Sequence, residues 1–482
     1  MPPLPFDGCC GITRRGFLVG AGTGLAAGAS LTWLGMRAWK KFHPDDANLF
    51  RARSREIESP AYAMPGPFPG RVIEVHRPDA VSPDNDVNPS AVKAMMERGM
   101  VELTGADHPQ EAWRRFFEPE DVVGIKVNPV GKKPSGAVGT GVSPVVGAIS
   151  NPAVLIEVVE GLKSAGVKAK NIIVFERYAN EFRDAGYEAV MNTRPMQGTR
   201  WFASATGYDN AQLDIEGYES RPGRPMRRDR DPHVVGYDPD VFVHMGFAQA
   251  DANFANDERR FRSHLSLIVT SMVNKIVTIP VLKDHRSAGV TLALKNLSHG
   301  MNNNVARSHL PSIYRLGDRT SAPNQCNTFI PTAAGQLELR QKATLHILDG
   351  LIGVYEGGPG SWNSTWATWQ RKSLFFATDP VALDHVGWDI IDTQRVQRGW
   401  LPVAMMGQLQ MAPPSAVSAY LAGLAARDGL DAAALTQAGS KAGPPQNLEQ
   451  FDRRQPEHII LAGTIGLGVF DAHQIEHRVI TL

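Results

Sequence analysis

Cysteine is scarce in this chain of 482 residues, which contains only three. Cys9 and Cys10 precede an arginine pair near the N-terminus and would be lost with a cleaved signal, which leaves Cys326 alone in the mature protein. No Cys-x-x-Cys pair occurs anywhere. An iron–sulfur cluster held by four thiolates and an intramolecular disulfide are therefore both excluded from the mature protein.

An excess of charge of one sign is also missing. Lys and Arg total 50 and Asp and Glu total 49, so no overall field draws the chain toward nucleic acid. The sequence contains no repeat of fixed period, no catalytic triad and no complete metal-binding motif. With 43% hydrophobic residues, the chain is globular in class and can bury one large core or two moderate ones.

The N-terminus carries the most specific motif. Residues 13–18, Thr-Arg-Arg-Gly-Phe-Leu, resemble the twin-arginine export signal, with Arg14 and Arg15 as its arginine pair. An uncharged stretch rich in Gly and Ala follows over residues 18–36. An ordinary membrane anchor or Sec signal is the alternative, since this stretch is just long enough to span a bilayer. Cleavage at the small residues 27–29 and an uncleaved anchor both stay open.

These features predict three parts of the chain. We expect a twin-arginine signal or anchor over residues 1–36, a charged and then Pro-rich linker over 37–70, and a single domain over 71–482. The protein would then be exported, and either periplasmic or membrane-anchored facing the periplasm. Its expected partner in export is the twin-arginine translocase.

The domain contains a well-marked βαβ unit. Residues 122–127 and 172–175 are short apolar runs rich in β-branched residues, as in buried parallel strands. Between them, Asn151 and Pro152 are a cap and first residue of a helix that Gly166 would end. Alternating strand and helix signals predict an α/β fold, with a mostly parallel sheet flanked by helices and several loop insertions.

Further elements are expected along the chain. The expected strands are 71–76, 276–282, 345–348, 374–377 and 458–462. The expected helices are 89–99, 109–117 and one beginning at Asp379. Two loop insertions are expected, over 194–240 and 301–331. Asp379 is followed by a proline, so its predicted role is to cap that helix rather than to catalyse.

In the central stretch, residues 275–300, charged and polar groups that are unfavourable to bury come directly after an apolar strand. Lys283, Asp284 and His285 end the run, and Lys295 and Asn296 follow a second apolar segment. Lys283 and Asp284 could form a structural ion pair. His285 stands between two cations, which favours a neutral imidazole that acts as base or metal ligand.

Polar residues also follow other predicted strands, among them Asp349 after 345–348 and Asp379 after 374–377. The carboxyl ends of parallel strands meet along one sheet edge where ligands bind. The candidate site residues are His285, Lys283 and Lys295 as catalytic groups, Lys126, Asn128 and Asn296 as ligand-binding groups, and Asp349 with Glu356 as ligands of a divalent cation. Glu176, at the end of the return strand, would lie along the same edge.

Five segments of the chain resemble the family described as domain of unknown function 362. They are VVGIKVNP (122–129), IPVLKDH (279–285), GVTLALKNLSHG (289–300), HILDGLIGVYEGGPG (346–360) and ATDPVALDHVG (377–387), and the resemblance extends over about residues 72–482. Many relatives carry a ferredoxin-like iron–sulfur segment. This chain lacks the cysteines for it, so the resemblance implies no cluster here, and the family implies no settled reaction.

Two functions remain open at this point. The first is an exported enzyme that acts on a small anionic substrate, with lysines binding carboxylate or phosphate groups. The second is a non-catalytic ligand-binding protein, or an accessory protein of an exported redox enzyme, without its own cluster.

Overall fold

The computed structural model describes residues 63–133, 145–208, 231–244, 262–305, 308, 325–363, 365–403 and 456–482, together with two short strands, β5 (Tyr218–Glu219) and β6 (Arg227–Arg228). Contacts divide the chain into two units, Met1–Ser54 and Arg55–Leu482, and every described residue lies in the second. The predicted signal, with Arg14 and Arg15, and most of the predicted linker lie outside the described residues. In the described part of the chain, no helix has both the length and the apolar character needed to cross a bilayer.

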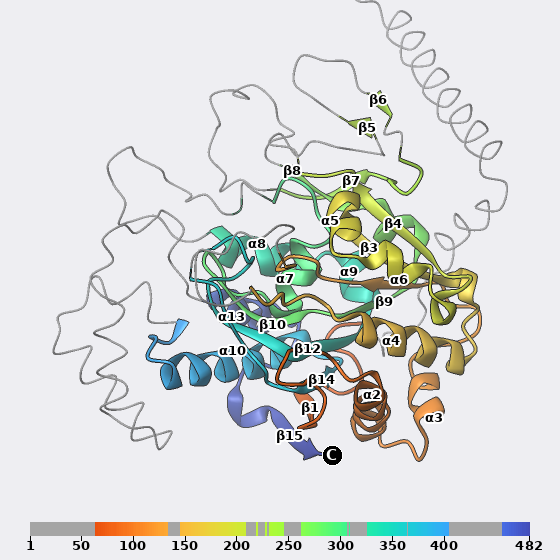
Figure 1. Cartoon of the computed structure of the whole chain (residues 1–482). Helices are drawn as coiled ribbons and strands as arrows, with labels where there is room; N and C mark the ends of the chain where they lie inside the picture. Colours follow the sequence, from red (N-terminus) through yellow and green to blue (C-terminus); the bar gives the residue numbers. More distant parts are fainter. Residues whose placement is uncertain are drawn as a thin grey trace, which may run out of the picture. The chain divides into compact units, whose positions relative to one another are not determined.

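A mixed, mostly parallel sheet of eleven strands organises the second unit (Figure 1). Its main path runs through β15 (Glu476–Thr481), β1 (Arg71–His76), β14 (Ser373–Ala377), β12 (Ala343–Glu356), β9 (Lys275–Thr278), β2 (Val123–Lys126), β3 (Ile172–Tyr178) and β4 (Arg200–Ala205). β10 (Val281–His285) and β13 (Ala367–Trp369) pair with β12, and β11 (Gly289–Val290) pairs with β10. Only β14 and the short β11 and β13 run antiparallel to their neighbours in this sheet, so the predicted α/β class is confirmed.

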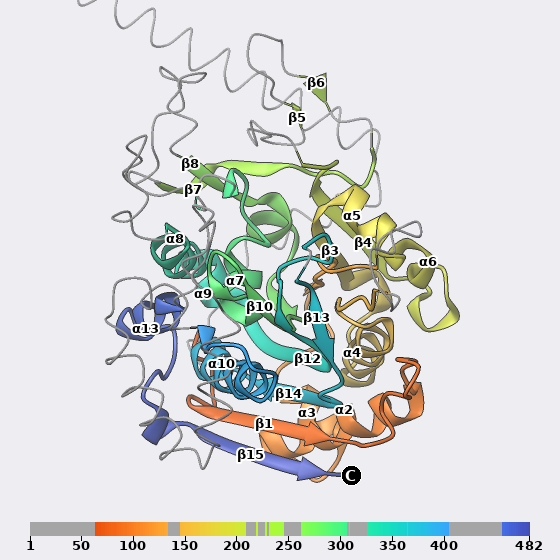
Figure 2. The ribbon, with the colours of Figure 1, turned by 60° about the vertical axis from the view of Figure 1, so that its left-hand side comes forward.

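Helices cover the sheet on both faces (Figures 1 and 2). Those associated with the large apolar core are α2 (Pro89–Thr104), α3 (Pro109–Arg114), α4 (Pro152–Ala165), α5 (Ala179–Asp184) and α6 (Tyr187–Met191). A second group packs together and contains α7 (Leu292–Ser298), α8 (Gln325–Ala334), α10 (Pro380–Gln397) and α13 (Glu457–Thr464). The remaining elements are α9 (Leu337–Lys342), the short helices η3 (Ala169–Asn171), η4 (Arg194–Met196), η7 (Ile268–Met272) and η10 (Ala472–Gln474), and a separate antiparallel pair, β7 (Tyr237–His244) and β8 (Arg262–Ser266).

The predicted βαβ unit is present as β2, α4 and β3. The side chain of Asn151 accepts a hydrogen bond from Ala153 N at 2.9 Å, Pro152 opens α4, and Gly166 ends it with φ +106°. That backbone conformation suits glycine, which has no Cβ to clash. β2 and β3 pair in parallel, so their carboxyl ends lie at the same edge of the sheet.

The predicted strand 276–282 is two strands, β9 and β10, separated at Ile279 and Pro280. Proline has no N–H to donate to a neighbouring strand, but its carbonyl oxygen accepts a hydrogen bond from Asp349 N at 2.8 Å. Both strands pair in parallel with β12. Lys283, Asp284 and His285 therefore belong to β10 rather than to a loop after it.

Two expectations about strand ends are wrong. β12 continues to Glu356, so Asp349 lies in the middle of a 14-residue strand and not at its end. β14 runs antiparallel to β12, so Asp379 lies at the edge opposite to the ends of β2, β3 and β10. The predicted capping role of Asp379 is confirmed, because its carboxylate accepts from Val381 N and Ala382 N at 2.9 Å each.

Three other elements differ from the prediction. Residues 458–462, expected as a strand, form part of helix α13. The expected insertion 194–240 contains β4, an edge strand of the main sheet. β15 has mostly exposed side chains, so its sequence lacks the apolar alternation that marks a strand.

Candidate functional site

A cluster of buried polar side chains lies where β2, β3 and β10 end beneath helix α7. It contains Lys126, Asn128, Glu176, Lys283, Lys295 and Asn296. All six are at least nine-tenths buried, and none is more than 8% exposed. The structure thus brings together five residues that the sequence predicted as catalytic or ligand-binding. We call this set the lysine cluster.

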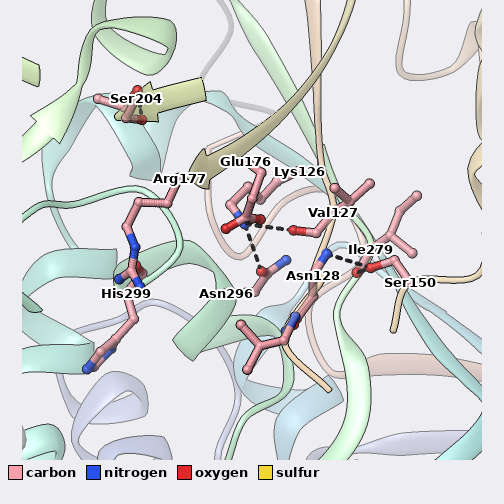
Figure 3. A network of polar contacts seen from close by, with 12 residues as sticks. Lys126, Val127, Asn128, Ser150, Glu176, Arg177, Ser204, Ile279, Asn296 and His299 are labelled. Carbon is pink, nitrogen blue, oxygen red and sulfur yellow. Dashed lines mark hydrogen bonds and ion pairs between the residues drawn. The ribbon is translucent and has the colours of Figure 1, made fainter. Parts of the chain in front are cut away.

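Lys126 is surrounded by acceptors. Its Nζ donates to the carboxylate of Glu176, to Val127 O at 2.7 Å and to Asn296 Oδ1 at 3.4 Å (Figure 3). Burial lowers the pKa of Lys126, and the Glu176 carboxylate opposes that effect. Three acceptors, one of them charged, satisfy all three N–H bonds of an ammonium group. Lys126 and Glu176 are thus a buried ion pair that links β2 to β3.

Asn128 connects β2 to Lys283 on β10. Its Oδ1 accepts from Lys283 Nζ at 3.1 Å and from Val130 N at 3.1 Å. Lys283 Nζ also donates to Val130 O. Burial, followed by the positive charge of Lys295, lowers the pKa of Lys283 to about 7. In the described part of the chain, no carboxylate forms an ion pair with this lysine.

Lys295 has the least compensated charge of the cluster. It lies on α7, is 8% exposed, and has no hydrogen-bond acceptor for Nζ among the described residues. Burial lowers its pKa to about 8, and the guanidinium of Arg177 acts in the same direction. His458 on α13 is fully buried, and burial together with Lys295 lowers its pKa to about 3, so it is a neutral imidazole.

Asn296 offers a hydrogen-bond donor to the same region. Lysine can only donate, so the side-chain atom that faces Lys126 must be Oδ1, which fixes the orientation of the amide. Nδ2 is then buried and has no partner within the described residues. A buried N–H group without an acceptor is costly, which makes this amide a candidate to bind a ligand.

Asp284 and Glu356 have a structural role. Arg395 on α10 is fully buried, and its Nη1 lies 2.6 Å from Glu356 Oε2 and 3.9 Å from Asp284 Oδ2. Asp284 Oδ1 also accepts from Gly358 N at 2.7 Å. The suggested ion pair between Lys283 and Asp284 is absent from the described contacts, because neighbouring residues of a strand point to opposite faces. These carboxylates instead bind helix α10 to the sheet.

His285 caps its own turn. Its Nδ1 accepts hydrogen bonds from Ser287 N at 3.0 Å and Ala288 N at 3.1 Å. An acceptor nitrogen carries no proton, so this arrangement requires the neutral ring with hydrogen on Nε2. Nδ1 is occupied and cannot take a proton from a substrate while the turn keeps this form.

The structure does not bring Asp349 and Glu356 together as ligands of one cation. They lie seven residues apart on one strand, which at about 3.3 Å per residue separates them by roughly 20 Å. Asp349 accepts from Asn151 N at 2.7 Å and from Leu351 N at 3.0 Å, and burial raises its pKa to about 6. Across the described ranges, no three His, Cys, Asp or Glu side chains gather as a metal site.

Sequence reasoning missed three supporting residues. Arg177 donates to His299 O at 2.6 Å, and Arg395 joins α10 to β12. Asp384 on α10 accepts from Ala293 N at 2.7 Å and caps α7. Arg177 directly follows Glu176 near the end of β3, so the sequence could have indicated that it lies near the same sheet edge. Asp384 and Arg395 lie inside a helix, and nothing in their local sequence shows which element they contact.

Comparisons with known proteins support the resemblance seen in the sequence. Residues 257–389 match the model of the family described as "Domain of unknown function (DUF362)". This range contains β10, α7, all of β12 and the first part of α10. The segment 122–129, which also resembled this family, lies outside the match. No curated protein matches the chain. One similar solved structure is the crystal structure of a protein from Thermotoga maritima, a Northeast Structural Genomics Consortium target, with 11% identity over 82% of this chain and 88% of that chain. Its TM-score is 0.34, so no argument rests on it.

Proposed function

We propose that this chain, whose residues 257–389 match the DUF362 family model, binds a small anionic substrate at the lysine cluster and acts on it as an enzyme. The observation that carries this proposal is the buried Lys295 ammonium, which has no acceptor among the described residues. A largely buried charge that has no protein acceptor is destabilising, and a bound anion offsets part of that cost.

The balance of charges supports an anionic ligand. Glu176, the carboxylate of the cluster, is already paired with Lys126. Arg177 lies near the buried carboxyl group of Glu181, whereas among the described residues no carboxylate forms an ion pair with Lys295, whose positive charge lowers the pKa of Lys283. The donor Nδ2 of Asn296 adds a directed contact for a carboxylate or phosphate oxygen.

Lys283 supports catalysis at this position. Its pKa of about 7 leaves a large fraction of the amine unprotonated at neutral pH, which suits a group that accepts a proton during a reaction. In this proposal Lys295 binds the anion and Lys283 is the general base. This role passes from His285 to Lys283 because Nδ1 of His285 is already bonded within its turn.

The test is anion binding to the purified full chain, measured by calorimetry with oxalate, phosphate and sulfate. We expect one site, and we expect Lys295→Met to weaken binding at least tenfold while Lys93→Met, on the exposed surface of α2, leaves it unchanged. Equal affinity in both variants, or no binding of any of the three anions, would overturn the proposal. Binding without any turnover across a substrate panel would favour the non-catalytic binding protein.

We also propose that the protein is exported by the twin-arginine route and faces the periplasm, free or anchored. The motif at residues 13–18 supports this proposal. Replacing both Arg14 and Arg15 with lysine keeps the charge but removes the arginine pair. We expect the variant to stay in the cytoplasm on cell fractionation, whereas continued export of the variant would argue for a Sec signal or anchor.

A further inference from the structure

The three lysines of the cluster differ in how many acceptors surround each amine. Lys126 has three, Lys283 has two, and Lys295 has none among the described residues. Lys126 and Lys283 are 1% and 0% exposed, so water does not supply further acceptors to their amines, whereas Lys295 is 8% exposed. The number of acceptors therefore indicates what each nitrogen does.

An ammonium group has three N–H bonds to satisfy, whereas a neutral amine has two and a lone pair. Lys283 Nζ donates to Asn128 Oδ1 and to Val130 O, which satisfies two N–H bonds. A third N–H would be buried without an acceptor, which is destabilising, and more so for a charged group. The surroundings of Lys283 thus match the neutral amine, with its lone pair directed away from both acceptors.

We propose that Lys283 Nζ is a nucleophile that forms an imine with the carbonyl carbon of a small oxo acid, whose carboxylate is bound by Lys295 and Asn296. This inference rests on the proposed anion-binding function and specifies its substrate class. Lys283 then acts as the nucleophile instead of a general base, Lys295 provides the charge that binds the acid, and Asn296 orients the acid through Nδ2.

The chemistry balances without a further reactant. The lone pair of Nζ attacks the carbonyl carbon, a C–N bond forms, and the C=O π pair moves to oxygen. A proton passes from nitrogen to that oxygen, which gives a carbinolamine. Loss of the oxygen as water, with the second proton of the amine, leaves the C=N bond of the imine. The sum is one amine and one carbonyl giving one imine and one water.

The electrostatics of the cluster agree with this role. Burial and the neighbouring Lys295 charge keep the pKa of Lys283 at about 7, so the nucleophilic form is abundant at neutral pH. Lys126, held by Glu176 and two further acceptors, has no lone pair to offer as an ammonium ion. The geometry therefore distinguishes Lys283 on β10 from Lys126 on β2.

The test is reductive trapping. The full chain is incubated with pyruvate and sodium cyanoborohydride, which reduces an imine to a stable amine, and the modified lysine is located by peptide mass spectrometry. We expect one adduct per chain on Lys283, in a reaction that is blocked by excess oxalate and that speeds up as pH rises through about 7. Lys283→Met should abolish the adduct, and the surface variant Lys93→Met should keep it.

The outcomes separate the two proposals. An adduct spread over surface lysines, or located on Lys295, overturns the inference. Calorimetric binding of oxalate and pyruvate without any adduct overturns the inference and leaves the anion-binding function standing. Failure of both anions to bind overturns both. The modified lysine is identified in the parent chain, so the result does not depend on whether the Lys283→Met variant folds.

Discussion

The ion pair between Lys126 and Glu176 is almost fully shielded from water, with side chains 1% and 4% exposed. Such a pair contributes little net stability when intact, because both charges lose their hydration. Removing one partner is a different matter, since the other charge stays buried and uncompensated. The intact pair therefore adds little to the stability of the fold, whereas breaking it is destabilising.

We expect Lys126→Met to lower the free energy of unfolding by about 3–5 kcal/mol, because the Glu176 carboxylate loses its cation. Lys132→Met is the control, since Lys132 forms a 2.6 Å pair with Asp184 near the surface and should cost about 1 kcal/mol or less. Urea unfolding gives both values. Adding Glu176→Leu to Lys126→Met should restore most of the loss; a double variant no more stable than the single one would contradict this account.

Asp349 predicts a dependence of stability on pH. Burial raises the pKa of its carboxyl from 3.8 to about 6, so the folded state holds the proton more tightly than the unfolded state. Its contribution to stability is therefore greatest below pH 4 and is lost as pH rises to about 6, by roughly 3 kcal/mol.

Asp349→Asn removes this titration. Relative to the parent chain, the variant should gain roughly 2.4 kcal/mol in unfolding free energy between pH 4 and pH 7, measured by urea unfolding at several pH values. Asp84→Asn, at an exposed position, should show no such trend. A constant difference between Asp349→Asn and the parent across this range would show that the carboxyl titrates normally.

The positions of these side chains could be predicted, but not their partners. Lys126, Lys283 and Lys295 stand at or after apolar runs, and the edge rule for parallel strands places them together. The acceptor of Lys283 is Asn128, 155 residues earlier in the chain, and no local pattern records such a contact. The expected position of Asp349 at a strand end was wrong because the strand, expected to end at residue 348, continues to Glu356.

At the scale of elements, helix α7 depends on a cap from another helix. Thr291 at its N-terminus makes no capping hydrogen bond, and the carboxylate of Asp384 on α10 accepts from Ala293 N and Leu294 N at 2.7 and 2.9 Å. Since α7 carries Lys295 and Asn296, α10 fixes the position of the anion-binding groups through this carboxylate.

We expect Asp384→Ala to reduce oxalate affinity about tenfold, which equals about 1.4 kcal/mol, because α7 loses the contacts that fix its start. Stability should fall by about 0.5–2 kcal/mol as two N–H groups lose their acceptor. Calorimetry and urea unfolding measure the two effects.

Asp379→Ala is the matched control. Asp379 is also a buried helix cap, but it serves α10 itself and lies at the opposite edge of the sheet. Its removal should cost stability and leave affinity unchanged. Loss of affinity in both variants would mean that general loosening, not the position of α7, weakens binding.

The elements with local signals were predictable. The caps Asn151 and Asp379, each followed by proline, marked helix starts that the structure confirms. Helix α13 was expected as a strand because its apolar run, residues 458–462, is short and rich in isoleucine and leucine, where periodicity does not separate the two forms. Tertiary packing against α8 and α10 decides in favour of the helix.

At the scale of the whole sheet, β15 is an edge strand that pairs with β1 alone. Its side chains are mostly exposed, so its contribution is made by backbone hydrogen bonds that cover the edge of β1. The strands β2, β3 and β10 and helix α7, which carry the lysine cluster, lie away from this edge (Figure 2).

Deleting residues 476–482 should therefore leave oxalate affinity unchanged but expose the edge of β1, whose unpaired backbone groups recruit other chains. We expect a shift to larger assemblies in size-exclusion chromatography with light scattering. Val479→Lys, which alters an exposed side chain and keeps the strand, should behave like the parent chain. An unchanged elution profile after the deletion would show that the exposed edge of β1 does not cause the chains to associate.

The pairing of β1 with β15 also constrains how the protein is made. Arg71 contacts Glu476, 405 residues later in the chain. β1 leaves the ribosome early in translation. Its outer edge then stays unpaired until β15, near the C-terminus, has been synthesised. The sheet is sealed only when those residues are synthesised, so a prematurely released chain exposes an open edge that chaperones and proteases can recognise.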